Sequence, residues 1–271
     1  MMSQATVSVA DGVDLAYSVR GGDQPARVVL IHSLALDRSV WDGVAERLAS
    51  QAAVLTYDCR GHGASSRVPG PYSLDLFADD LAALLDAVGW DAAVVAGASM
   101  GGSVAQAFAT RYPERISGLG LIDTTAWYGA DAPERWEERA QQAEQKGLPS
   151  LIDFQLTRWF GDGFRQAFPE QVEHLKQVFL ANDVGPYMAA CRMLGSFDLR
   201  ERIRHVHVPT AIVVGEEDYA TPPAMARDIQ ARVRGSTYLE LAGVRHLSVV
   251  EAVQPTVEVL RNLLRSVARV S

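Results

Sequence analysis

Short apolar runs alternate with helical patterns along most of the chain. Two runs near the N-terminus, at residues 7–9 and 15–19, flank an Asp-Gly dipeptide and predict an antiparallel hairpin. The later runs lack polar alternation, which predicts strands buried on both faces. These later runs lie at residues 28–31, 54–57, 93–96, 119–122, 211–214 and 238–241.

Helical spacing of apolar residues occurs between several of these runs, at residues 40–49, 74–88 and 100–111. Strand and helix therefore alternate. Right-handed crossovers would place these strands in a mostly parallel sheet with helices on both faces, so we predict a doubly wound α/β fold.

The alternation stops between residues 126 and 208, where helical and aromatic-rich stretches replace the strand-like runs. We expect a core domain of residues 1–126 and 208–271, with a helical cap of residues 127–207 inserted into it. Aromatic side chains dominate core burial, so most of the cap aromatics should pack inside the cap. A minority should line a pocket.

Composition and charge exclude several classes of protein. A chain that is 48% hydrophobic and 21% charged is an ordinary folded globule and not a disordered protein. The net charge of −8, without a basic block, makes nucleic acid an unexpected partner. Cys59 and Cys191 lie far apart and form no metal-spaced cluster. With no signal segment and no apolar run near the ~18 residues that span a bilayer, we expect a cytoplasmic protein without membrane contact.

Residues 97–101 have the sequence Gly-Ala-Ser-Met-Gly, between an apolar run and the helical pattern that begins at Met100. A nucleophile elbow needs this context, because small residues on both sides of the serine allow a tight turn from strand to helix. We therefore predict that Ser99 is a nucleophile. The alternative is an ordinary helix start that Ser99 caps.

A serine hydroxyl needs a base within hydrogen-bond reach and an acid that orients the base. Asp218 follows the run at residues 211–214, and His246 follows the run at residues 238–241. Both are expected in loops at the carboxyl edge of the sheet. We predict Asp218 as the acid and His246 as the base, which gives the chain order Ser, Asp, His of α/β-hydrolases.

Other residues compete for these two roles. Asp123 ends the run at residues 119–122 and is the alternative acid. His62 lies in a loop with two glycines and is the alternative base, although its imidazole could instead hold that loop by hydrogen bonds. His32 ends a predicted strand, where we expect it to brace the backbone.

Acyl transfer also needs donors for the developing oxyanion. The N–H of Met100, directly after the nucleophile, is one candidate. The N–H of Leu34, in the loop after the run at residues 28–31, is the other. The glycine-rich segments match neither a dinucleotide fingerprint nor a P-loop, and no metal constellation occurs, so we expect chemistry without a cofactor or a metal.

Five motifs in this order make the chain resemble the α/β-hydrolase superfamily over nearly its whole length. They are His32-Ser33-Leu34, the segment 58–63 with Arg60-Gly61-His62-Gly63, the serine motif 97–102, the segment 215–218 that ends in Asp218, and His246. The resemblance implies an eight-stranded sheet whose second strand is antiparallel, with a cap after strand six.

Within the superfamily the chain is most similar to the 3-oxoadipate enol-lactonases of aromatic-ring catabolism. The cap segment 133–139, with Trp136 and Arg139, carries part of this likeness. The resemblance implies substrate contacts from Ser33, Trp136 and Arg139, with Arg139 binding a substrate carboxylate. The alternative is a solvated Arg139 paired with a glutamate. Ala35-Leu36 departs from the family, which tends to glycine and a small polar residue there.

The sequence thus predicts a serine hydrolase that opens a small lactone or carboxylic ester through an acyl-enzyme, with water as the second reactant. The other activities open to this triad are those of a general carboxylesterase, a carbon–carbon bond hydrolase or a cofactor-free perhydrolase. A slow-turnover ligand receptor of the same fold is the alternative from a different class. The sequence indicates no oligomeric state.

Overall fold

An eight-stranded sheet forms the centre of the protein, in the strand order β1-β2-β4-β3-β5-β6-β7-β8. The structure is a computed structural model that describes residues 3–270. Strand β2 is antiparallel to both of its neighbours and the remaining pairs are parallel, as the sequence predicted. The strands are β1 (Ser3–Ser8), β2 (Asp14–Arg20), β3 (Arg27–Ile31), β4 (Ala53–Tyr57), β5 (Ala93–Ala98), β6 (Ile116–Ile122), β7 (Thr210–Gly215) and β8 (Thr237–Leu241).

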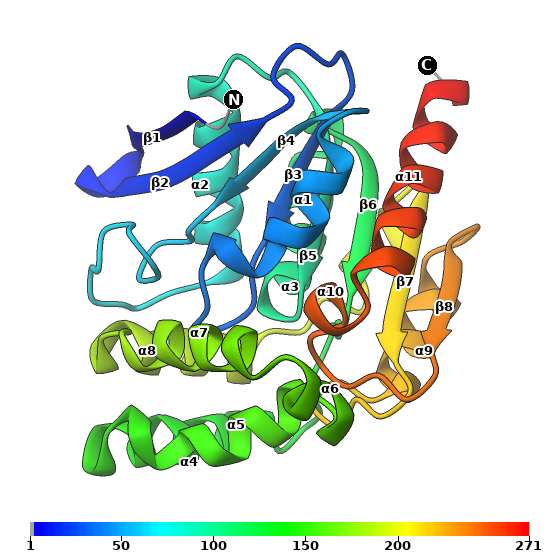
Figure 1. Ribbon diagram of the computed structural model, residues 1–271. Coiled ribbons are helices and arrows are strands. Elements are labelled where there is room, and N and C mark those ends of the chain that lie inside the picture. The colour runs from blue at the N-terminus through cyan, green and yellow to red at the C-terminus, as the bar shows by residue number, and fades with distance from the viewer. Residues whose placement is uncertain (1–2, 271) are drawn as a thin grey trace.

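Helices cover both faces of this sheet (Figure 1). Helices α1 (Asp42–Leu48) and α11 (Val253–Val270) pack together on one face, and α2 (Leu74–Ala87) and α3 (Met100–Arg111) pack together on the other. This double cover explains why every residue of β4, β5 and β7 is buried. Helices α9 (Pro223–Arg232) and α10 (Ser248–Glu251) complete the core. Short 3-10 helices occur at Ala10–Gly12, Arg38–Trp41, Pro113–Arg115, Leu148–Leu151 and Arg202–His205.

Strand β8 differs from the expectation of burial on both faces. It is an edge strand whose residues alternate in exposure, and Leu239 is 37% exposed. An edge strand has a neighbour on one side only, so part of its surface faces solvent. The pattern expected at residues 40–49 is also divided between a 3-10 turn and α1.

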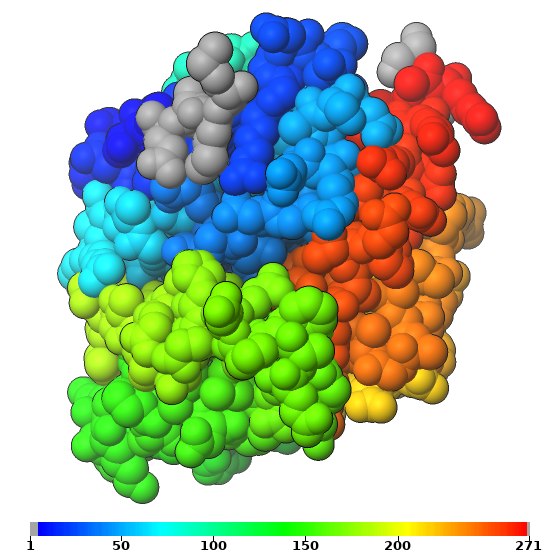
Figure 2. All heavy atoms as spheres, viewed as in Figure 1, coloured from blue at the N-terminus to red at the C-terminus, as the bar shows by residue number. Residues whose placement is uncertain are grey.

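Five α-helices and two of the short 3-10 helices occupy the chain between β6 and β7, where the sequence predicted helical structure. The α-helices are α4 (Ala132–Lys146), α5 (Ile152–Trp159), α6 (Asp162–Ala167), α7 (Pro169–Leu180) and α8 (Val184–Ser196). Figures 1 and 2 show them as a green layer against one end of the sheet. Phe160, Phe179 and Tyr187 are buried within it. The domain limits of the cap stay a prediction.

Within residues 3–270, none of the helices combines the length and the hydropathy that a membrane-spanning segment needs. The two long helices, α4 and α11, both mix charged and apolar positions.

The turn from β5 into α3 is possible because Gly97 and Gly101 let the backbones of β5, α3 and β3 approach one another closely. A Cβ on Gly97 would lie 2.0 Å from the carbonyl oxygen of Gly101, and a Cβ on Gly101 would lie 2.2 Å from that of Ile31. Ser99, between the glycines, has φ 54° and ψ −116°, a conformation that L-residues rarely adopt. The bend therefore depends on the absence of side chains at residues 97 and 101.

The substitution Gly97→Ala should lower the free energy of unfolding by about 1–3 kcal/mol or more, because the added methyl group meets backbone that cannot move aside. Chemical denaturation would measure the change. Gly163→Ala is the matched control, since a Cβ at Gly163 meets nothing within 4 Å. Equal stability of the two variants would contradict this account of the turn.

Candidate active site

Three residues from distant parts of the chain form a continuous hydrogen-bond chain. Ser99 Oγ lies 2.9 Å from His246 Nε2, and His246 Nδ1 lies 2.8 Å from Asp218 Oδ2. An ionised carboxylate only accepts hydrogen bonds, so Nδ1 carries the ring proton. Nε2 is then free to accept the hydrogen bond of the Ser99 hydroxyl. The structure thus brings together the three residues that the sequence singled out.

The Asp218 carboxylate is fully satisfied. Oδ1 accepts hydrogen bonds from the N–H groups of Ala220 and Thr221, and Oδ2 also accepts one from the Thr221 hydroxyl. Burial disfavours its charge, but His246 and the Thr221 donors outweigh burial and lower the pKa of Asp218 below its ordinary value. The carboxylate therefore stays ionised at neutral pH and fixes the imidazole tautomer.

Asp123, the alternative acid, forms no hydrogen bond with His246. Its Oδ1 accepts from the N–H of Gly215 at 3.1 Å, and its Oδ2 accepts from the N–H and hydroxyl of Ser248 at 2.8 and 2.7 Å. It thereby links the loops that carry Asp218 and His246. Burial, and then the Asp218 charge, raise the pKa of Asp123 well above its ordinary value.

The alternative base, His62, also has another partner. Its Nδ1 bonds the Arg60 carbonyl, while His32 Nε2 accepts from the N–H of Cys59. Burial lowers the pKa of His32 to about 4 and that of His62 to about 3. Both rings are neutral at physiological pH. Both form hydrogen bonds with backbone groups, as the sequence suggested for His32.

The two predicted oxyanion donors lie beside Ser99. Met100 is the first residue of α3, and Leu34 lines the same cavity as Ser99 and His246. Neither N–H donates a hydrogen bond to another described residue. Ala35, the next residue after Leu34, has φ 57°, a left-handed conformation that favours glycine. The Asn182 side chain at the end of α7 donates to the Ala35 carbonyl at 2.8 Å and holds this loop.

A cavity of about 20 Å³ lies at Ser99, and helices α4 and α5 form much of its wall. A second pocket of about 190 Å³ lies next to it and shares Tyr128, Trp136, Arg139 and Arg158 with it. The cavity is lined by Ser33, Leu34, Ser99, Tyr128, Trp136, Arg139, Gln155, Arg158, Trp159 and His246. All the substrate contacts implied by the resemblance are therefore at the cavity.

Arg139 is held by aromatic side chains. Its Nε donates to the Tyr187 hydroxyl at 2.6 Å, and its Cζ lies 5.1 Å from the ring centre of Trp136. The alternative reading placed Arg139 in solvent beside a glutamate. The nearby Glu137 instead pairs with Arg192, at 2.7 Å.

Four residues of the cavity wall were not predicted as site residues from the sequence: Tyr128, Gln155, Arg158 and Trp159. Tyr128 follows β6, and burial raises its pKa to about 12, so its phenol stays protonated. Gln155 and Arg158 lie one turn apart on α5. No pattern in the sequence indicated that Gln155 would line the cavity of Ser99.

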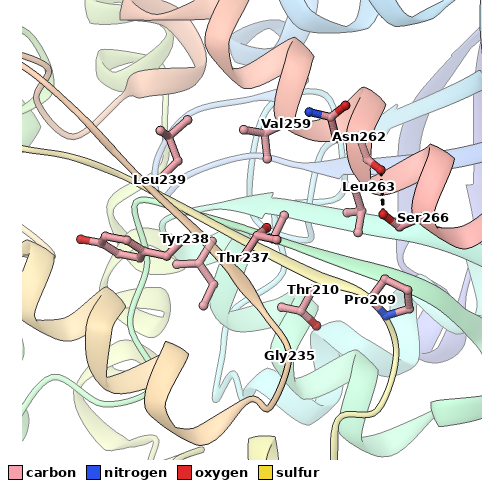
Figure 3. A pocket seen from close by; sticks show the side chains of 12 residues that line it. Pro209, Thr210, Gly235, Thr237, Tyr238, Leu239, Val259, Asn262, Leu263 and Ser266 are labelled. Carbon is pink, nitrogen blue, oxygen red and sulfur yellow. Dashed lines mark hydrogen bonds between the residues drawn. The ribbon is translucent and has the colours of Figure 1, made fainter.

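A larger pocket of about 270 Å³ lies away from Ser99, between β7, β8 and α11 (Figure 3). Its lining includes Tyr238, Leu239 and Val259. The twelve residues that line it include no acid, histidine, cysteine, lysine or arginine, and none of them lines the Ser99 cavity. We therefore place the candidate active site at Ser99. Within the described residues, no group of His, Cys, Asp or Glu could hold a metal ion.

Comparisons with known proteins agree with this fold. A sequence model described as "alpha/beta hydrolase fold" matches residues 26–253. The 3-oxoadipate enol-lactonase 2 of Acinetobacter baylyi is 33% identical over 246 residues, which cover 90% of this chain and 91% of the relative.

Solved structures have the same fold over nearly the whole chain. The enol-lactonase from Burkholderia xenovorans LB400 has a TM-score of 0.92 and 31% identity, over 96% of this chain and 100% of that one. A thermophilic esterase from Thermogutta terrifontis, solved with malate bound, has a TM-score of 0.91 and 28% identity, over 98% and 99%.

Fold and relatives together define an enzyme of the hydrolase class. The chain belongs to the α/β-hydrolase fold family.

The substitution Asp123→Asn tests the two candidate acids. An amide places N–H groups against the donors of Gly215 or Ser248, so the free energy of unfolding should fall by about 1–3 kcal/mol. Hydrolysis of p-nitrophenyl acetate should fall far less than in Asp218→Asn, for which about a 10⁴-fold loss is expected. A folded Asp123→Asn variant that loses as much turnover as Asp218→Asn would identify Asp123 as the acid.

Proposed function

We propose that the protein is a serine hydrolase that opens a small lactone or carboxylic ester. The hydrogen-bond chain from Ser99 through His246 to Asp218 is the observation that carries this proposal. Ser99 Oγ attacks the substrate carbonyl while His246 Nε2 takes its proton, and the Asp218 carboxylate stabilises the resulting imidazolium. The N–H groups of Leu34 and Met100 are the proposed oxyanion donors.

The second half of the reaction uses the same base. The imidazolium gives its proton to the leaving oxygen as the carbonyl–oxygen bond breaks, and in a lactone that oxygen stays attached to the acyl group. His246 then takes a proton from water, which attacks the ester on Ser99 and frees the serine. One water is consumed for each bond opened, and the product carries a new carboxylate.

The proposed substrate is small and carries a carboxylate of its own. Seven of the ten side chains at the cavity are polar or charged, and two of them are arginines. Such a wall suits a polar anion better than a long alkyl ester. Similarity to enol-lactonases supports a lactone, and similarity to an esterase solved with malate supports a general carboxylesterase as the second candidate.

We also propose that residues 127–207 act as a lid. The cavity of about 20 Å³ has room for little more than one water molecule, so a substrate must displace part of its wall. The neighbouring pocket shares four wall residues with the cavity and is the proposed entrance. A role in aromatic-ring catabolism and a cytoplasmic location stay predictions.

Replacing the nucleophile tests the mechanism. Ser99→Ala should fold normally and lower kcat by about 10⁴- to 10⁶-fold on p-nitrophenyl acetate and on small lactones, because no other hydroxyl can take its place. Ser266→Ala, in the pocket of Figure 3, is a matched control that should keep full activity. Unchanged turnover of purified Ser99→Ala would end this mechanism, while single turnover by the wild type would favour a receptor.

Arg139→Ala tests the substrate class. Loss of a charge-assisted contact should raise KM for a carboxylate-bearing lactone about tenfold more than for a neutral ester. Steady-state kinetics on both substrates would measure the difference, with Arg192→Ala as a control, since Arg192 pairs with Glu137 and does not line the cavity. Equal effects of Arg139→Ala on both substrates would remove Arg139 from carboxylate recognition.

A further inference from the structure

Gln155 presents a buried amide to the active-site cavity without a protein partner. The residue is 3% exposed and lines the cavity that holds Ser99 and His246. Its Oε1 accepts no hydrogen bond from any described residue. A buried amide left without a partner destabilises the fold, so the position is costly unless something polar binds there.

Arg158 presents a charge at the same place. Its guanidinium lines both the cavity and the neighbouring pocket, and its Cζ lies 5.7 Å from the ring centre of Phe154. No carboxylate of the described residues pairs with it. Burial, and then the nearby Arg139, lower the pKa of Arg158 to about 10, so it remains charged at neutral pH. The charge of Asp218 acts on Arg158 without forming an ion pair with it, so Arg158 is a largely buried cation that lacks a direct counter-ion and can attract an anion.

The segment that carries these two side chains also holds the base. The carbonyl of Arg158 accepts from the N–H of His246, and that of Trp159 accepts from the N–H of Leu247 at 3.1 Å. Glu251 reinforces this contact because its carboxylate accepts from the N–H groups of both Gly161 and Arg245, each at 2.9 Å. A ligand bound by α5 is therefore held in a fixed position relative to His246.

We propose that Arg158 and Gln155, one turn apart on α5, form an anion subsite that binds carboxylate oxygens of the substrate and of the ring-opened product. This inference rests on the proposed function and extends its substrate class. Arg158 and the Nε2 group of Gln155 donate to carboxylate oxygens, and Gln155 Oε1, which a carboxylate cannot satisfy, accepts from water or from a hydroxyl of the bound molecule.

This subsite supplies free hydrogen-bond donors for a carboxylate, beyond those that Arg139 alone can offer. The Nε of Arg139 is already used by Tyr187, and its charge rests against the rings of Trp136 and Tyr187. Arg158 also lies near an aromatic ring, that of Phe154, but its guanidinium donates no hydrogen bond to a described residue, so its planar fork can bind two carboxylate oxygens. The two arginines then bind the anion from α4 and α5 together.

Binding of succinate, a small dicarboxylate that the enzyme cannot hydrolyse, tests the subsite by calorimetry on the full chain. Arg158→Met should raise the succinate Kd about ten- to hundredfold, and the Kd of Arg158→Lys should fall between those of the wild type and Arg158→Met. Arg192→Met removes the same charge from an exposed position on α8 that does not line the cavity and should leave Kd within about twofold. Succinamide, the neutral isostere, should bind at least tenfold more weakly than succinate.

Gln155→Met separates a binding role from a structural one. Removal of a buried amide without a partner should raise Tm by about 2–4 °C, while the succinate Kd should rise about tenfold. Gln155→Glu should abolish succinate binding, because its carboxylate would pair with Arg158 and repel the ligand. A side chain that only fills space would not produce this opposite change in Tm and Kd.

The proposal is overturned if the wild type does not bind succinate at 10 mM, a concentration of about ten times a millimolar Kd. It is also overturned if succinamide binds equally well, or if Kd in Arg158→Met or Gln155→Met stays within about twofold of the wild type. Failure of the proposed function gives a different result, which is retained turnover in Ser99→Ala. That result is independent of succinate binding.

Discussion

The close approach of β5, α3 and β3 at two glycines is the constraint on which the site depends. Because residues 97 and 101 carry no side chain, the chain can reverse within a few residues and hold Ser99 at φ 54°. Backbone strain of this kind persists only where the surrounding structure fixes it. The turn places the Ser99 hydroxyl within 2.9 Å of an imidazole from a loop 147 residues later.

The partners of Ser99 are held with comparable rigidity. Asp123 links the loops of Asp218 and His246, and the end of α5 bonds the backbone of the His246 loop. The helical layer therefore contributes to the catalytic geometry as well as to the cavity wall. The helical layer also supplies positive charge, because Arg139 and Arg158 line the cavity of a protein whose net charge is −8. A local positive field of this kind can attract a small anion.

Much of the core could be predicted from the sequence because each signal was local. Apolar runs predicted the strands, and Ser99, Asp218 and His246 each follow such a run, so they were expected at the carboxyl edge of a parallel sheet. Asp123 follows a run in the same way, and the structure separates it from Asp218. Gln155 and Arg158 could not be predicted in this way, since their position depends on how α5 packs against the core. The exposed face of β8 was missed because an apolar run does not distinguish an edge strand from a central one.

Covalent labelling is the most direct test of Ser99 as the nucleophile. The wild-type enzyme would be treated with a fluorophosphonate and digested, and mass spectrometry would locate the adduct. The account predicts stoichiometric modification on the peptide that contains Ser99, with loss of activity in proportion to labelling. Full inactivation with the adduct on another residue, or full esterase activity after complete modification of Ser99, would contradict it.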